Sequence, residues 1–218
     1  MTLLQIERLT VGYNGHRVLN DVSLAIERGE RIALIGRSGV GKTTLLQHLF
    51  GLRKEDTALV PQELGLVRAL SVFHNIFMGR LNAHTGWYNI ANLVRPFRRE
   101  VDHVRPIADR LGLAEKLFTP VQELSGGQQQ RTAVARALFN ASPIFMGDEP
   151  VSSIDEHQSH VVLRAVVETH ETVVLSMHDV ALALQYSDRV VGLKDGRIAF
   201  DAPAKTVKAS DLDELYRS

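Results

Sequence analysis

The sequence predicts an α/β fold around a mostly parallel sheet, with a helical segment inserted between two parts of the core. Three observations predict this class. An apolar strand at 32–35 leads through a glycine-rich turn into a helix at 43–50. A second apolar strand at 144–146 precedes two adjacent carboxylates, and much of the chain between these units has helical spacing. Strands that alternate with helices favour a parallel sheet covered on both faces.

The N-terminal third is expected to consist of strands and turns. Val22, Leu24 and Ile26 alternate with polar residues, as in a half-buried strand. The continuous apolar run at 32–35 is typical of a strand buried on both faces of a parallel sheet. We expect the following helix, 43–50, to end at Gly51, because glycine is the preferred residue just past a helix.

The remaining elements divide the chain further. Helical spacing dominates 64–138, after which strands at 144–146 and 172–177 flank a helix at 161–167. Two short strands, 190–193 and 197–201, flank Lys194-Asp195-Gly196, which indicates a hairpin. We therefore expect one domain over 1–218, with a core of about 1–63 and 139–218 and a helical subdomain of about 64–138.

Composition limits the kind of partner. The 218 residues carry 25 basic and 25 acidic side chains, so the chain has no overall attraction to nucleic acid, and none is expected as a partner. With no cysteine, disulfides and thiolate metal sites are excluded. The sequence shows no secretory signal and no apolar stretch near the roughly 20 residues of a membrane span. Membrane association would therefore go through another protein.

The glycine-rich turn reads GRSGVGKT from Gly36 to Thr43, a full GxxxxGK[ST] phosphate loop in the expected strand–loop–helix setting. Glycines let backbone N–H groups curl around phosphate oxygens, and the helix N-terminus adds a favourable dipole. Lys42 would meet the β and γ phosphates of ATP, and the Thr43 hydroxyl would meet Mg²⁺. Residues predicted to hold the nucleotide here are Gly36, Arg37, Ser38, Gly39, Val40, Gly41, Lys42, Thr43 and Thr44.

A pair of acids follows the second apolar strand, in PIFMGDEP at 143–150. Alone, such a pair is most often a solvated turn, but beside a phosphate loop it suits metal-assisted phosphoryl transfer. Asp148 would hold Mg²⁺, and Glu149 would orient or deprotonate the attacking water. Gly147 is unexpected in this strand, where a packed side chain is the norm.

The run LSGGQQQR at 124–131 is more specific. It resembles the signature motif of ABC ATPases, and with it the resemblance covers essentially the whole chain, as a P-loop NTPase core of that type. In the family's order, Tyr13 in VGYNG resembles the adenine-stacking aromatic, and Gln62 in LVPQE the Q-loop glutamine. SSID at 152–155 resembles the D-loop, and His178 in LSMHD the switch histidine.

The resemblance implies a site shared between two subunits. Ser125, Gly126 and Gly127 open a helix and would bind the γ-phosphate held by the other subunit. A homodimer is thus expected, with ATP and Mg²⁺ as cofactors. The residues expected to be catalytic are Glu149, His178, Lys42 and Gln62; Tyr13 and Asp155 would contact nucleotide; Thr43, Gln62 and Asp148 would hold the metal.

Two features narrow the resemblance. Only residues 45–61 separate the start of the phosphate-loop helix from Gln62, where family members have a longer segment, so a shortened N-terminal β-subdomain is expected. FMGRL at 77–81, Trp87, Phe97 and the ending at 211–216 look similar to phosphonate-import ATPases. Phe77, Leu81 and Trp87 are also expected to contribute to the subdomain core.

The leading interpretation is therefore the ATPase subunit of an importer for phosphonate or a related oxyanion. It would lie at the cytoplasmic face of the inner membrane, bound to permease subunits and working indirectly with a substrate-binding protein. Val67, Leu70, Val72 and Phe73 are the expected docking surface, with burial in the core as the alternative. Other possibilities are an ABC ATPase for lipoprotein release or cell division, a soluble non-transport ABC ATPase, or a non-hydrolysing binding module.

Overall fold

The computed structural model describes residues 1–13 and 16–216 and confirms the α/β class. Asn14 and Gly15, the last two residues of the VGYNG motif, lie outside the described residues. A six-stranded sheet has the order β4-β5-β6-β3-β7-β8, in which every pair is parallel except the β7–β8 hairpin. Its strands are β3 (Arg31–Ile35), β4 (Thr57–Val60), β5 (Ile144–Asp148), β6 (Thr172–Ser176), β7 (Arg189–Lys194) and β8 (Arg197–Pro203).

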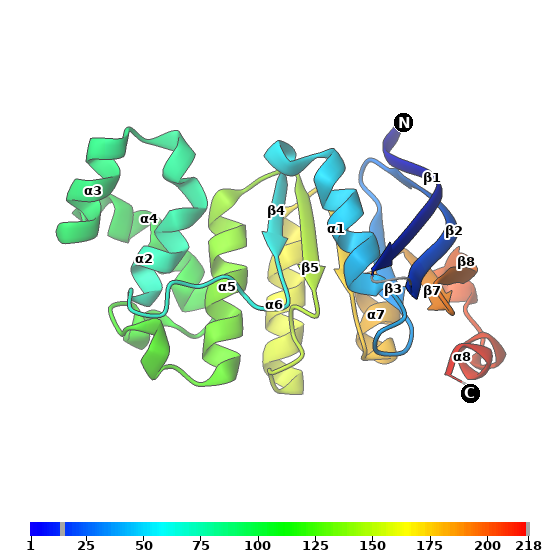
Figure 1. Ribbon diagram of the computed structural model, residues 1–218. Helices are drawn as coiled ribbons and strands as arrows, with labels where there is room; N and C mark the ends of the chain where they lie inside the picture. Colours follow the sequence, from blue (N-terminus) through cyan, green and yellow to red (C-terminus); the bar gives the residue numbers. More distant parts are fainter. Residues whose placement is uncertain (14–15, 217–218) are drawn as a thin grey trace.

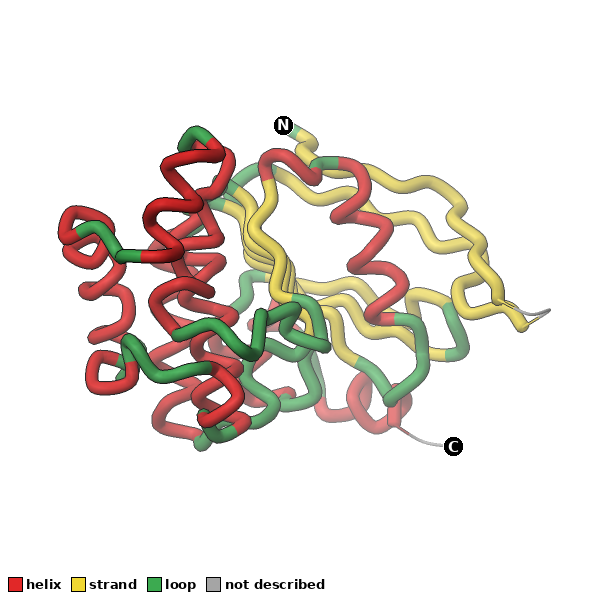
Figure 2. Tube along the Cα trace, turned by 60° about the vertical axis from the view of Figure 1, so that its left-hand side comes forward, coloured by secondary structure: helices red, strands yellow, loops and turns green. Residues whose placement is uncertain are grey.

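A separate antiparallel ribbon, β1 (Thr2–Tyr13) with β2 (His16–Glu27), forms the short N-terminal β-subdomain that the sequence predicted. Val22, Leu24 and Ile26 all lie in its buried face, as their alternation predicted. Helix α1 (Lys42–Leu52) lies between this ribbon and the six-stranded sheet (Figure 2). From α1 the chain passes through one 3₁₀ turn, η1 (Lys54–Asp56), directly into β4.

Gly51 does not end this helix, contrary to expectation. α1 continues through it to Leu52, and the chain turns at Arg53, whose N–H donates to the Phe50 carbonyl. A Cβ on Gly51 would meet no atom within 4 Å, so nothing there demands glycine. The reason is conformational: a glycine ends a helix when it adopts positive φ, and Gly51 is not among the positive-φ residues.

The middle of the chain is helical. It contains α2 (Val72–Phe77), α3 (Gly86–Val94), α4 (Arg98–Arg110) and α5 (Gly126–Asn140), linked by the 3₁₀ turns η2 (Met78–Ala83), η3 (Ala114–Lys116) and η4 (Val121–Glu123). Figure 1 shows α2, α3 and α4 at one end of the molecule, with α5 between them and the sheet. The exact division into core and helical subdomain stays a prediction.

Helices α6 (Glu156–Thr169), α7 (Val180–Tyr186) and α8 (Ala209–Tyr216), with the 3₁₀ turn η5 (Ala204–Thr206), complete the C-terminal part. Both faces of the sheet are covered, because alternate residues of β3 enter different cores. Ala33 and Ile35 pack with α5, α6 and α7, whereas Ile32 and Leu34 pack with α1 and the ribbon. None of the described residues forms a helix long and apolar enough to cross a bilayer.

Two residues of the expected docking surface are core residues instead. Val72 and Phe73 begin α2 behind the cap Ser71 and are fully buried in the larger core, Phe73 stacking on Phe77. Of the three residues expected in the subdomain core, Phe77 is buried, but Trp87 is mostly exposed and Leu81 is also exposed, so the expectation is wrong for these two.

Candidate functional site

The phosphate loop joins the C-terminal end of the central strand β3 to α1. Gly36, Gly39 and Gly41 all have positive φ, which glycine adopts at little cost. Space is also restricted: a Cβ on Gly41 would lie 2.7 Å from the Leu19 side chain, and one on Gly36 would lie 2.4 Å from the Leu193 carbonyl oxygen. The motif therefore has glycine where the turn and its close neighbours exclude side chains.

Lys42 is buried at the start of α1, and its ammonium closes the loop on itself. Nζ donates to the carbonyl oxygens of Gly36 at 2.8 Å and Arg37 at 3.1 Å. Burial lowers the pKa of the Lys42 ammonium, and the charges of Glu149 and Asp148 act in the opposite direction. The two acids predicted from the sequence are thus electrostatic neighbours of the predicted phosphate-binding lysine.

Both acids lie at the C-terminal end of β5, which is separated from β3 in the sheet by β6. Asp148 is the last residue of this strand, and Glu149 follows it. Asp148 is buried, and its Oδ1 has no hydrogen-bond partner among the described residues. A buried carboxylate oxygen without a partner is costly unless a cation or a donor meets it, and oxygen ligands are those that Mg²⁺ prefers. The Thr43 hydroxyl and the Gln62 amide, which line a cavity beside Glu149, would add two further oxygen donors of the kind that fits that ion.

Glu149 and His178 form a direct pair. His178 follows β6, the neighbour of both β3 and β5, and its Nε2 donates to Glu149 Oε1 at 2.6 Å. Parallel strands bring their carboxyl ends to one edge, so two residues far apart in sequence meet there. Glu149 itself has φ of 54°, a left-handed conformation uncommon for a residue with a side chain.

Lys42 and Glu149 line a cavity of about 240 Å³, whereas Asp148 and His178 do not. Gln62, which follows β4, joins its wall although its side chain is exposed, so the short preceding segment still brings it to the phosphate loop. Of the predicted site residues, the cavity is lined by Ser38, Gly39, Gly41, Lys42, Thr43, Thr44, Gln62 and Glu149.

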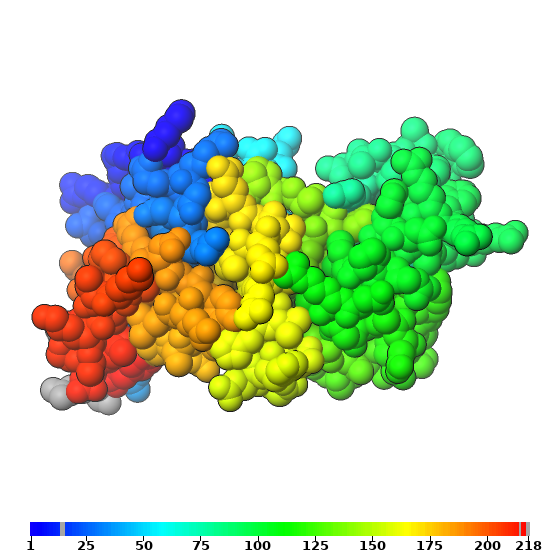
Figure 3. Space-filling view, turned by 180° about the vertical axis from the view of Figure 1, so that it is seen from behind, coloured from blue at the N-terminus to red at the C-terminus, as the bar shows by residue number. Residues whose placement is uncertain are grey.

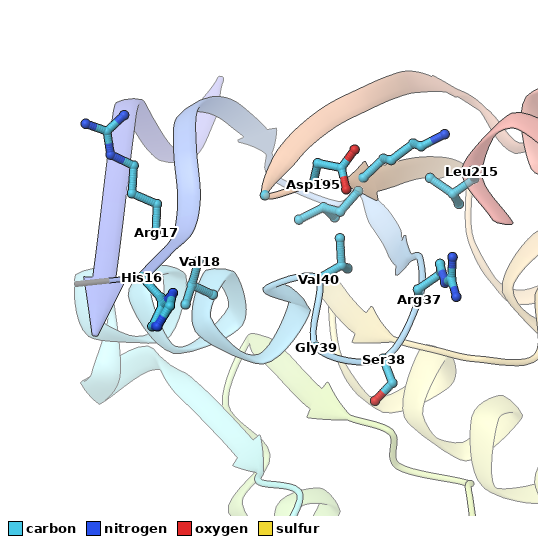
Figure 4. A pocket seen from close by; sticks show the side chains of 12 residues that line it. His16, Arg17, Val18, Arg37, Ser38, Gly39, Val40, Asp195 and Leu215 are labelled. Carbon is cyan, nitrogen blue, oxygen red and sulfur yellow. The ribbon is translucent and has the colours of Figure 1, made fainter. Parts of the chain in front are cut away.

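A second cavity, of about 630 Å³, adjoins the first and shares Val18, Ser38 and Gly39 with it. Figure 4 shows Val40 pointing into this space and Ser38 pointing away from it, with the ribbon on one side and Leu215 of α8 on the other. Arg37 and Val40, both predicted nucleotide contacts, line only this second cavity. Tyr13 is exposed at the end of β1 and pairs in register with His16, another wall residue.

The signature residues are not brought to the phosphate loop of their own chain. Ser125 caps α5 through a capping box with Gln128, and Ser125 and Gly126 are exposed. Neither cavity is lined by Ser125, Gly126 or Gly127. Asp155 is also absent from both linings; its carboxylate accepts from the Gln158 N–H and caps α6. One chain thus holds two separated groups of predicted site residues.

Sequence reasoning missed Gln130. This buried residue lies in α5, and its amide contacts the Glu149 carbonyl and the segment that follows it. The signal was available, because Gln130 belongs to LSGGQQQR, but only the first residues of that motif were singled out. Gly147 also has a reason to be glycine: a Cβ there would lie 2.9 Å from Phe145 and 3.0 Å from Pro150.

Comparison with known proteins agrees with this geometry. A family model described as ABC transporter matches residues 19–152. The phosphonates import ATP-binding protein PhnC of Escherichia coli O157:H7 is 31% identical, covering 100% of this chain and 95% of that protein. That alignment spans 251 positions against 218 residues here, so the relative has insertions relative to this chain.

A second relative, phosphonates import ATP-binding protein PhnC 1 of Pseudomonas syringae pv. tomato (strain ATCC BAA-871 / DC3000), is 37% identical, covering 93% of this chain and 87% of that protein. Among solved structures, the dimeric structure of a bacterial ABC transporter cassette matches with a TM-score of 0.77 at 22% identity, covering 94% of this chain and all of that one. This last likeness supports the fold. By motif, fold and relatives, the chain belongs to the ABC transporter family, as one of its ATP-binding cassettes.

Proposed function

We propose that this chain is the ATP-hydrolysing subunit of an ABC importer and that it works as one half of a dimer. One observation carries the proposal. The Lys42 ammonium, the unpartnered Asp148 carboxylate oxygen and the Glu149–His178 pair lie at the carboxyl edge of the sheet, where Lys42 and Glu149 line one cavity together with the phosphate loop. A lysine, a metal-binding acid and a positioned base are the parts that phosphoryl transfer to water needs.

In this proposal Glu149 accepts a proton from the attacking water, and His178 holds the carboxylate through its Nε2. The Lys42 ammonium exchanges the carbonyls of Gly36 and Arg37 for phosphate oxygens of ATP. Thr43, Gln62 and Asp148 would hold Mg²⁺, whose charge offsets the negative charge that develops on the phosphates. The nucleoside would extend past Ser38 and Gly39 toward Tyr13. The support for this placement is that Ser38 and Gly39 line both of the adjoining cavities.

The second subunit is required because each chain carries its site residues in two groups. Ser125 and Gly126 are exposed at the N-terminus of the 15-residue helix α5, where backbone N–H groups and the helix dipole attract anions. A second copy, arranged head to tail, would place this helix end over the γ-phosphate. ATP would then contact both chains, so it should favour the dimer by mass action.

The test is a comparison of wild type with Glu149→Gln. Loss of a positioned base should lower ATP turnover by about 10²- to 10⁴-fold. The substitution keeps the side-chain size, so Mg-ATP should still bind, and slow hydrolysis should let the dimer accumulate. Turnover, nucleotide affinity and sedimentation with and without Mg-ATP are measured together. Glu115→Gln serves as the control, because it makes the same carboxylate-to-amide change at an exposed position in η3.

Near-normal turnover in Glu149→Gln would remove this residue from the mechanism. A sedimentation profile unchanged by Mg-ATP at high protein concentration would count against the shared site. The two halves of the proposal are thus tested by separate readouts on the same protein.

A permease is the proposed partner at the helical end, and the outer face of α3 is the proposed contact. Trp87, Ile90 and Val94 follow one face of this helix and are 71%, 66% and 81% exposed. The opposite face buries polar groups: Tyr88 donates to Glu100, and Asn92 accepts from the Phe97 N–H. A helix that exposes its apolar side and buries its polar side indicates a surface that another protein covers.

Beside this face lies an apolar groove of about 220 Å³, whose walls include Leu70, Phe77 and Leu93. Leu70 was part of the docking surface expected from the sequence and keeps that proposed role, together with the exposed Val67. The curated relatives are named as import ATP-binding proteins, which favours a permease as the occupant. The chain would then sit on the cytoplasmic side of the membrane through this contact.

Phosphonate, or a related oxyanion, is the proposed cargo of the whole transporter. Its support is the name of the relatives at 31% and 37% identity, since the cargo need not touch this subunit. Deleting the gene should abolish growth on a phosphonate as the sole phosphorus source, and wild type but not Glu149→Gln should restore it. Growth that persists after deletion would favour another cargo or another ABC system, such as lipoprotein release.

A further inference from the structure

The side chain of Gln130 joins two parts of the molecule that the proposed dimer assigns to different nucleotides. Its Nε2 donates to the Glu149 carbonyl at 2.6 Å and to Ser152 Oγ at 3.2 Å. Its Oε1 accepts from the Ser153 N–H at 2.8 Å. Gln130 is buried, so both ends of the amide are satisfied within the protein rather than by water.

Glu149 needs such support, because its backbone conformation is unfavourable. It has φ of 54° and precedes Pro150, whose ring restricts the conformations of the preceding residue. A strained residue keeps its conformation only when its surroundings fix it. Three hydrogen bonds to its backbone do so here. The Glu149 N–H donates to the Ser176 carbonyl, and the Glu149 carbonyl accepts from the Gln130 amide at 2.6 Å and from the Ser152 N–H at 3.3 Å.

The other end of the connection is the exposed start of α5. Gln130 lies one helical turn beyond Ser125 and Gly126, on the same rigid helix. The first turn also touches the segment after Glu149 directly, because a Cβ on Gly127 would lie only 2.8 Å from the Ser153 carbonyl oxygen. A shift of this helix end would therefore move the hydrogen bonds that hold Glu149.

We propose that Gln130 is a positioning residue that couples the two ATP sites of the dimer. This rests on the proposed function, in which the start of α5 binds the phosphate of one site while Glu149 of the same chain serves the other. Closure of the helix on one nucleotide then sets the backbone of Glu149 at the second. The interaction is reciprocal, so both sites should be needed for efficient turnover.

The test substitutes Gln130→Met, which keeps the length of the side chain and removes the amide. Turnover should fall about 10- to 100-fold, the size of effect expected when a catalytic group is misplaced by about an ångström. The affinity of a single chain for Mg-ATP should stay within about twofold, because Lys42 and the phosphate loop are untouched. The Hill coefficient for ATP should fall from above one to about one.

Asn75→Leu is the matched control. Asn75 is a fully buried amide in α2 that bonds to Val67, Leu70 and Ser71, so its loss costs stability in the same way without touching Glu149. Thermal unfolding of both variants shows how much of any change follows from stability alone. Equal loss of turnover in the two variants would overturn the positioning role.

The remaining outcomes are equally decisive. Wild-type turnover in Gln130→Met refutes the inference, and reduced turnover with an unchanged Hill coefficient refutes the coupling of the two sites. Wild type and Glu149→Gln are assayed alongside. If wild type hydrolyses no ATP, the proposed function fails and this inference fails with it; if it does hydrolyse ATP, the Gln130→Met result judges the inference alone.

Discussion

The two ends of this molecule differ in which side chains they bury and which they expose. At the carboxyl edge of the sheet, charged groups are drawn inward: Lys42 and Asp148 are buried, and Glu149 is held in a strained conformation. At the helical end, α3 turns its apolar face outward, with Trp87 and Val94 largely exposed. Figure 3 shows that this helical part lies at the far end from the ribbon and the C-terminal strands and helix.

The difference shows what each end is built to meet. Buried charges without full pairing are costly, so their persistence at the sheet edge fits a charged ligand that completes them. Exposed apolar side chains cost little in a free chain but gain free energy when covered, which fits a protein partner. The same physical terms thus separate a nucleotide site from a docking surface.

The largest expected effect contrasts two aromatic residues of the helical end. Phe73→Ala should lower the free energy of unfolding by about 3–5 kcal/mol, because a fully buried ring leaves a cavity. Trp87→Ala should change it by at most about 0.5 kcal/mol, because its ring is mostly in solvent. Urea unfolding followed by circular dichroism measures both.

The exposed side chains of α3 should matter to the permease rather than to stability. Trp87→Ala combined with Val94→Asn should weaken co-purification with the permease while leaving the Mg-ATP affinity of the isolated subunit unchanged. Full co-purification would place the docking surface elsewhere. A large loss of stability in Trp87→Ala would instead mean that its ring belongs to the core and would break the comparison between the two ends.

A smaller effect is expected at two glycines. Gly147→Ala should cost about 1–3 kcal/mol, because its Cβ would press on Phe145 and Pro150, and it should also lower ATP turnover by shifting the adjacent acids. Gly51→Ala, inside α1 with open space around it, should stabilise by about 0.5–1 kcal/mol. Chemical denaturation with a parallel ATPase assay tests both, and equal effects on stability would contradict the packing argument.

The smallest expected effect lies at the amino edge of the sheet, away from the nucleotide. Burial lowers the pKa of His170, whose Nδ1 bonds to the Ser142 carbonyl. The unfolded chain then binds a proton that the folded chain does not, so stability should fall as pH drops below about 6.5. One such proton contributes at most about 1.4 kcal/mol per pH unit.

His170→Gln should therefore lose less stability than wild type between pH 7.5 and pH 5.5. Thermal unfolding at the two pH values measures this difference. Identical losses in the two proteins would show that other groups carry the acid sensitivity.

Much of this protein follows from local sequence alone. Gly36 to Thr43 determined the phosphate loop, because glycines between a buried strand and a helix permit few other backbone paths. The alternation at Val22, Leu24 and Ile26 and the apolar run at 32–35 predicted their strands and burial. Such features depend on residues close in the chain, where side-chain period and backbone preference act directly.

Other features were decided only when distant segments packed together. Val72 and Phe73 have the same apolar character as Trp87, yet the first two are core and the third is surface, since burial depends on what other helices cover. Helical spacing shows that a helix has an apolar face, but not whether that face packs into the core or lies in solvent. Gln130 gained its contacts because α5 packs against the end of β5, and Glu149 meets His178 because β5 and β6 are parallel neighbours. The sequence identified Glu149 and His178 as site residues, but only the order of strands in the sheet determined that they contact each other.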